Sequence, residues 1–186
     1  MLNKTEFRII LKELESYEEK RESLIQLSRE IIRISKQIIY GVHRNDIKNT
    51  ASLEKQIRSK IKKLPKESYE TSIINVARYE YVEALCFYEF VNNNKIPTKK
   101  SLGIDADSYL LGLADLTGEL ARKAVNDSIK KNIKSVVKIK ELIEEIYGEF
   151  LKFDLRNGEL RQKYDSIKWN LKKVEDLVHE NILRKR

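Results

Sequence analysis

The chain has 186 residues, with 37 lysines and arginines against 29 aspartates and glutamates, and its formal net charge at pH 7 is +8. Its one cysteine, Cys86, excludes a disulfide framework and a cysteine-based zinc site. No apolar run approaches the roughly 18–20 residues of a membrane span, and the N-terminal segment lacks the apolar core of a signal peptide. We therefore expect one cytoplasmic domain over residues 1–186, without a membrane partner.

The positive charge is unevenly distributed along the chain. Residues 51–66 hold six basic side chains and one acidic side chain, and residues 130–140 hold five lysines and no acid. Residues 67–94 have the opposite sign, with five glutamates against Arg78 alone. The basic stretches indicate attraction to a polyanion such as a nucleic acid. The simplest interpretation of the acidic stretch is a solvated helix face.

The spacing of apolar residues predicts helices along almost the whole chain, without a convincing run of alternating strand residues. The first helix ends near Asn45-Asp46, and the second ends before Pro65, because proline disfavours helix in the residue ahead of it. A basic connection at 95–103 has room for one short turn. The predicted helices cover residues 4–44, 49–63, 67–91, 105–126, 132–152 and 159–182.

These segments predict an all-α fold, an antiparallel bundle of six or seven helices. Predicted helices of about 25 to 40 residues are long for a monomer of this size. We therefore expect some helix faces to be buried against other subunits.

A pair of glutamates on the predicted helix 67–91 is the first candidate for a functional site. Glu80 falls in the middle of the apolar stripe of that helix and Glu83 lies at its edge, because residues three apart share one face. A carboxylate in place of an apolar core residue is costly unless it is paired or bound to a metal. The alternative is an ion pair that satisfies Glu80, for instance with an arginine of a neighbouring helix.

The second candidate lies on the helix that follows the basic connection. Asp115 and Glu119 are four residues apart and share a face with Arg122, while leucines and alanines cover most of the remaining surface. A buried network of acids and arginine is again the alternative. Gly112 and Gly118 each cost the helix roughly 1 kcal/mol relative to alanine, so we expect another backbone to approach closely at both positions.

Carboxylates from two helices suit a hard divalent cation. Mg²⁺ and Mn²⁺ prefer oxygen ligands, which Glu80, Glu83 and Asp115 together supply. Other chemistries have little support, because His43 and His179 are far apart in the sequence. The chain also has no HExxH motif, no CxxC motif and no phosphate-binding glycine loop.

Four segments carry a pattern that extends over most of the chain. They are Arg29–Arg44, Glu80–Ala84, Tyr109–Leu120 (YLLGLADLTGEL) and Leu160–Glu175. Together they resemble the translin family, whose members include translin and translin-associated factor X. The second and third segments are closer to the factor X version and the fourth is closer to translin, and this chain is shorter than both.

The resemblance implies an all-helical subunit that assembles into a hollow homo-octamer and binds single-stranded RNA or DNA. It also implies metal-dependent endoribonuclease activity. In this family that activity belongs to factor X, which uses two glutamates three apart on one helix and the aspartate of the Ala-Asp-Leu-Thr-Gly-Glu motif. These positions correspond to Glu80, Glu83 and Asp115, which would be catalytic and hold Mg²⁺ or Mn²⁺. Glu119 would orient a ligand or pair with Arg122. The mixed motifs suggest one chain that performs both roles, from an archaeal source.

Contacts to nucleic-acid phosphates are expected from the basic stretches and from Arg78, which could also stack on a base. The candidate residues are Arg58, Lys60, Lys62, Lys63, Arg78, Lys130, Lys131 and Lys134. Two other interpretations stay open. One is a non-catalytic module that binds single-stranded RNA or DNA and uses its carboxylates in structural ion pairs. The other is a structural helical protein whose positive charge reflects a lysine-rich composition.

Overall fold

The computed structural model describes residues 2–65 and 71–183, and every regular element within these ranges is a helix. The all-α prediction is therefore confirmed. The elements are α1 (Lys4–His43), α2 (Ile47–Ile61), α3 (Ile73–Asn93), α4 (Lys99–Leu102), α5 (Ala106–Ile129), α6 (Ile133–Phe150) and α7 (Glu159–Leu183).

Short polar side chains set several of the helix ends. Asp46 accepts a hydrogen bond from the backbone N–H of Asn49, and α2 consequently begins two residues earlier than predicted. At the start of α5, the carboxylate of Asp105 accepts a hydrogen bond from the Ser108 N–H at 2.8 Å. Asn94 ends α3 in the left-handed conformation, with φ of 54°. The predicted start of the third helix at residue 67 lies outside the described residues.

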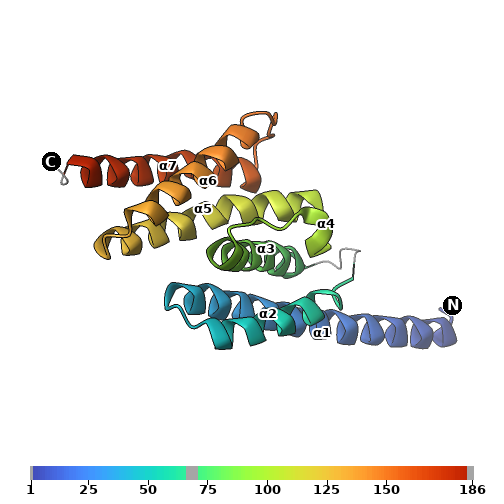
Figure 1. Cartoon of the computed structure of the whole chain (residues 1–186). Helices are drawn as coiled ribbons and strands as arrows, with labels where there is room; N and C mark the ends of the chain where they lie inside the picture. Colours follow the sequence, from blue (N-terminus) through green and yellow to red (C-terminus); the bar gives the residue numbers. More distant parts are fainter. Residues whose placement is uncertain (1, 66–70, 184–186) are drawn as a thin grey trace.

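Four helices form the body of the molecule in the spatial order α1, α3, α5, α7, each packed on the next (Figure 1). Helix α2 packs on α1, and α6 packs on both α5 and α7. Fully buried apolar side chains from each of the four central helices fill the core, for example Ile31, Leu85, Leu120 and Ile167. Within the described ranges, no helix has the length and apolar character needed to cross a membrane.

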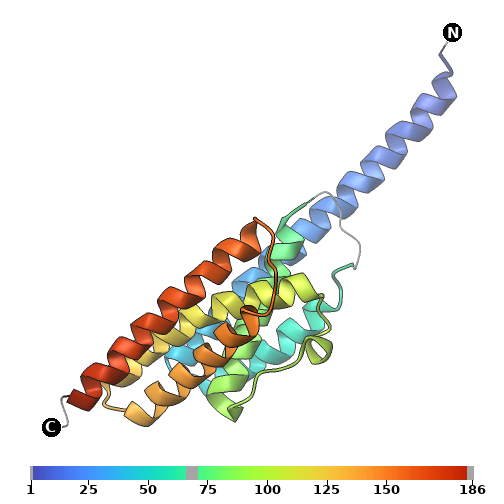
Figure 2. The same ribbon diagram turned by 90° about the horizontal axis from the view of Figure 1, so that it is seen from above.

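The first half of α1 extends well beyond the bundle (Figure 2). Only the second half of α1 contributes buried residues, beginning at Ser28. The two candidate carboxylate segments, in contrast, lie on α3 and α5 in the middle of the molecule, where neighbouring helices approach them from both sides.

Candidate functional site

Helices α3 and α5 bring together the carboxylates that the sequence analysis singled out. Glu80 and Glu83 lie one turn apart on α3, and Asp115 and Glu119 lie one turn apart on α5. The four are close enough for the charges of Glu80, Asp115 and Glu119 all to act on Glu83. All four are only partly exposed. The result is an acidic cluster across the α3–α5 interface, in a protein whose net charge is positive.

Gly112 explains why the two helices approach closely enough to form this cluster. A Cβ atom at Gly112 would lie 2.6 Å from Cβ of Val82 and 2.7 Å from the backbone oxygen of Tyr79. No side chain fits there unless α3 and α5 move apart, so the expected close approach is confirmed at this position. It is wrong at Gly118, where the nearest atom that a Cβ would meet is the side-chain nitrogen of Asn170 at 3.8 Å.

Three of the four carboxylates have cationic partners. The partners of Glu80 and Asp115 lie on other helices, and Glu119 has one on its own helix. Nζ of Lys36, on α1, lies 3.6 Å from Oε1 of Glu80. The ammonium group of Lys163, on α7, donates a hydrogen bond to Oδ2 of Asp115. Glu119 has two partners, because its Oε2 lies 2.5 Å from Nε2 of His43 and 3.5 Å from a guanidinium nitrogen of Arg122.

Glu83 differs from the other three carboxylates. Among the described residues it makes no ion pair, although it lies between the other acids. Loss of hydration and the negative charges of Asp115, Glu80 and Glu119 raise the pKa of Glu83 to about 8, against an ordinary value of 4.5. At neutral pH this side chain is therefore mostly protonated in the absence of a bound cation.

The other carboxylates titrate according to their partners. Burial raises the pKa of Glu80, and Lys36 partly offsets that effect. Burial likewise raises the pKa of Asp115, against the opposing hydrogen bond from Lys163. In contrast, the hydrogen bond with His43 lowers the pKa of Glu119. The cluster thus contains one firmly ionised acid and one acid that burial and its neighbours keep neutral.

The donor set of this cluster matches the chemistry of Mg²⁺ or Mn²⁺, which prefer carboxylate oxygens. A divalent cation would also remove the electrostatic cost of ionising Glu83. The side chains do not converge on one point as they stand, because residues 2–65 and 71–183 contain no group of three acidic, histidine or cysteine side chains placed to hold a metal ion. Cation binding would require Asp115 and Glu80 to exchange their lysine partners for the metal.

Sequence reasoning missed three residues of the site, namely Lys36, His43 and Lys163. The His43 ring is buried, with 6% of its side chain exposed, and it packs against Phe87 of α3 at a centroid distance of 4.8 Å. Lys163 also lies over the ring of Tyr79, 4.4 Å from its centroid. A usable signal existed for His43, because it follows Ile39 by four residues on the apolar face of α1.

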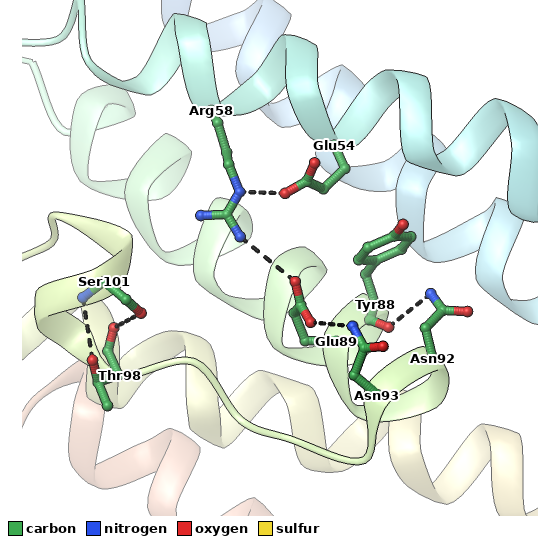
Figure 3. A network of polar contacts seen from close by, with 8 residues as sticks. All are labelled: Glu54, Arg58, Tyr88, Glu89, Asn92, Asn93, Thr98 and Ser101. Carbon is green, nitrogen blue, oxygen red and sulfur yellow. Dashed lines mark hydrogen bonds and ion pairs between the residues drawn. The ribbon is translucent and has the colours of Figure 1, made fainter.

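The basic residues predicted to contact phosphates fall into two groups. Arg58, Lys60 and Arg78 are already engaged within the subunit. Arg58 bridges Glu54 of its own helix and Glu89 of α3, the latter at 3.7 Å (Figure 3). Lys60 pairs with Glu30 at 2.8 Å, and Arg78 donates a hydrogen bond to the backbone oxygen of Pro65 at 2.5 Å.

The second group is solvent-exposed and makes no ion pair within the described part of the chain. Its members are Lys62, Lys63, Lys130, Lys131 and Lys134. Lys62 and Lys63 follow the end of α2, and Lys130 and Lys131 form the turn between α5 and α6. These five lysines are available to a polyanion, whereas the three engaged residues would first have to lose an internal partner.

Comparison with known proteins places this arrangement in a family. Residues 19–185 match the Translin family. The uncharacterized protein MJ0175 of Methanocaldococcus jannaschii is 32% identical over 183 residues, which cover 93% of this chain and 82% of that protein. The translin-associated protein X homolog of Schizosaccharomyces pombe is 26% identical over 196 residues, covering 92% of this chain and 84% of that protein.

Solved structures agree with this result. The crystal structure of apo-NeC3PO superposes with a TM-score of 0.89 at 30% identity, covering 97% of this chain and 98% of that one. AfC3PO, in a complex with duplex RNA, gives a TM-score of 0.81 at 24% identity, covering 97% of this chain and 96% of that one. The second likeness shows a shared fold.

Proposed function

This chain belongs to the translin family, and we propose that it is a metal-dependent endoribonuclease that acts on single-stranded RNA within a homo-oligomer, the octamer that family resemblance implies. One observation carries the proposal. Four carboxylates from α3 and α5 form one partly buried cluster, and the central one, Glu83, has no cationic partner among the described residues. Structural ion pairs alone give no reason to keep an unpaired acid there.

In this proposal Glu80, Glu83 and Asp115 hold Mg²⁺ or Mn²⁺. When bound, the cation supplies an acidified water molecule and charge stabilisation at the scissile phosphate. Glu83 would lose its proton when the cation binds and would then be one of its ligands. Glu119, fixed by His43 and Arg122, would limit how far the α5 carboxylates can move.

The exposed lysines would draw RNA to the protein. Phosphate contacts of this kind give affinity that falls steeply with salt and depends little on sequence. For AfC3PO the bound nucleic acid is duplex RNA. Assays on this chain should therefore compare a single strand with the duplex of the same sequence.

The decisive experiment measures cleavage of a labelled single-stranded RNA with Mn²⁺, with Mg²⁺ and with a chelator. Glu83→Gln, Glu80→Gln and Asp115→Asn should each reduce cleavage by 100-fold or more, while RNA affinity changes less than about threefold. Glu54→Gln is a matched control, because Glu54 is a half-buried acid paired outside the cluster. Unchanged cleavage in all three cluster variants would refute the proposed site.

One observation favours a second candidate, a binding protein without catalysis. Three of the four carboxylates already have cationic partners, and no metal-binding group of three is preformed in the described residues. Such a protein would bind RNA with a strong salt dependence, and its RNA would stay intact in Mn²⁺ whichever cluster variant is used.

A further inference from the structure

The first half of α1, residues 4–20, forms an arm that extends beyond the bundle of its own subunit (Figure 2), and every residue of the arm except Tyr17 is exposed. The arm nevertheless carries large apolar side chains in solvent. Phe7 and Leu11 are each 56% exposed and Leu14 is 58% exposed. These three residues are spaced by four and three, so they form one stripe. Contiguous exposed apolar surface of this kind marks an interaction site.

The stripe on the arm is not a continuation of the face that α1 buries in its own core. That face is marked by Ile31, Ile34 and Ile38. At about 100° per residue, the mean direction of Phe7, Leu11 and Leu14 is rotated from that face by roughly 150°, about two-fifths of a turn. The arm is therefore shaped for a surface other than α3, on which the rest of α1 packs.

A groove of about 690 Å³ on the body of the subunit offers such a surface. It lies between α6, the end of α3 and the first turns of α5. Its apolar lining includes Phe90, Leu110, Leu113, Leu142 and Phe153. Along one edge, α6 presents a line of exposed charges that is basic near its start and acidic toward its end. These are Lys134, Lys138, Glu141, Glu145 and Glu149.

The arm carries the complementary line of charges beside its apolar stripe. In chain order these are Lys4, Arg8, Lys12, Glu15 and Glu19, all exposed. Their spacings of four, four, three and four residues repeat the spacings on α6 when α6 is followed backwards from Glu149 to Lys134. Laid antiparallel, the two lines place a basic residue opposite an acidic one at all five positions. Within the described ranges only Glu149 has an ion-pair partner of its own, Lys152 in the next turn.

The arm cannot reach the groove of its own subunit. It is part of one continuous 40-residue helix that leads away from the bundle. We propose that the arm of a second copy of this chain occupies the groove. Phe7, Leu11 and Leu14 would enter the apolar lining, and the five charge pairs would fix the direction and register. Lys134 would then pair with Glu19 of the second copy, which leaves Lys62, Lys63, Lys130 and Lys131 for RNA. This contact gives a structural basis to the self-association that the proposed function invokes, but it does not depend on the carboxylate cluster.

Charge reversal on the full-length chain tests this contact. Arg8→Glu and Glu145→Lys should each weaken self-association at least tenfold, measured by sedimentation and by light scattering after gel filtration. The two substitutions combined should restore it to within about threefold of the wild type. Glu13→Lys is a control on the arm, because it makes the same charge change as Glu145→Lys at an exposed position away from the stripe.

A disulfide test gives a second readout at the same positions. Chains carrying Arg8→Cys, mixed with chains carrying Glu145→Cys, should form a covalent heterodimer on mild oxidation. The native Cys86 is buried and stays out of this reaction. Single reversals that leave the assembly unchanged, or a combined variant as weak as the single ones, would overturn the proposal. Failure of the nuclease proposal would appear elsewhere, as RNA cleavage that persists in Glu83→Gln.

Discussion

Glu83 provides a test of the cluster that needs neither RNA nor activity. Its pKa is raised to about 8 in the folded protein, against 4.5 as the ordinary value. The folded state therefore binds this proton more tightly than the unfolded state. The resulting penalty is absent below pH 4.5, grows as the pH rises from 4.5 to 8, and is complete above pH 8. Glu83→Gln keeps the shape of the protonated acid and removes the penalty.

The size of the effect follows from the two pKa values. At 1.36 kcal/mol per pH unit, the penalty for ionised Glu83 reaches about 5 kcal/mol, and relaxation around the charge reduces the expected value to about 3 kcal/mol. Glu83→Gln should therefore match the wild type in free energy of unfolding near pH 4.5. It should exceed the wild type by about 3 kcal/mol at pH 8.5.

The assay is urea denaturation followed by far-ultraviolet circular dichroism at several pH values between 4.5 and 8.5. The difference between the two proteins isolates Glu83, because other titrating groups act on both. Millimolar Mn²⁺ should reduce the difference in free energy of unfolding between the two proteins at pH 8.5, because it stabilises only the wild type. A difference that is constant with pH, or that favours the wild type at pH 8.5, would show that Glu83 is not held neutral by its surroundings.

Three further substitutions, two of them with a comparison variant, test packing within the subunit by the same denaturation assay. Gly112→Ala should lower the free energy of unfolding by about 1–3 kcal/mol because the new Cβ collides with Val82. Gly118→Ala, whose Cβ would make only an ordinary contact with Asn170, should raise it by up to about 1 kcal/mol. Equal effects would refute the close approach. His43→Ala should cost about 2–4 kcal/mol by removing both the partner of Glu119 and the contact with Phe87, and a neutral result would show that neither matters. Ser135→Ala should lower the free energy of unfolding by about 1–2 kcal/mol, because Asp127 loses a hydrogen bond of 2.6 Å near the α5–α6 turn. The control is Ser52→Ala at an exposed position of α2, which should change the free energy of unfolding little.

Local sequence signals were sufficient for the helices and for most of the acidic cluster. Short polar residues such as Asp46, Asp105 and Asn132 cap helices wherever they precede an amphipathic run. Spacings of three and four put the acids of α3 on one face and those of α5 on another. The spacing within each helix does not predict that α3 and α5 pack together. The resemblance to a known family supplied that prediction.

The cationic partners of the cluster could not be found in the same way. Lys36 and Lys163 are members of ordinary polar faces on α1 and α7, and only the rotation of those helices about their axes directs them toward α3 and α5. Gly112 and Gly118 illustrate the same limit. Both stand in the middle of one helix, yet only Gly112 faces the backbone of α3, because that choice depends on where the axes cross.

Most charged side chains of the acidic cluster, and Arg58 and Lys60 of α2, are paired within the subunit. Acids at the α3–α5 interface receive cations from α1 and α7, and basic residues of α2 receive acids from α1 and α3. Glu83, the exposed lysines at the ends of α2 and α5, and nine of the ten charges in the matched lines on the arm and α6 make no ion pair among the described residues; Glu149 is the tenth. We propose that the charges at these three places meet partners outside the subunit. A cation, a nucleic acid and a second copy of the chain are the partners whose charge and shape fit them.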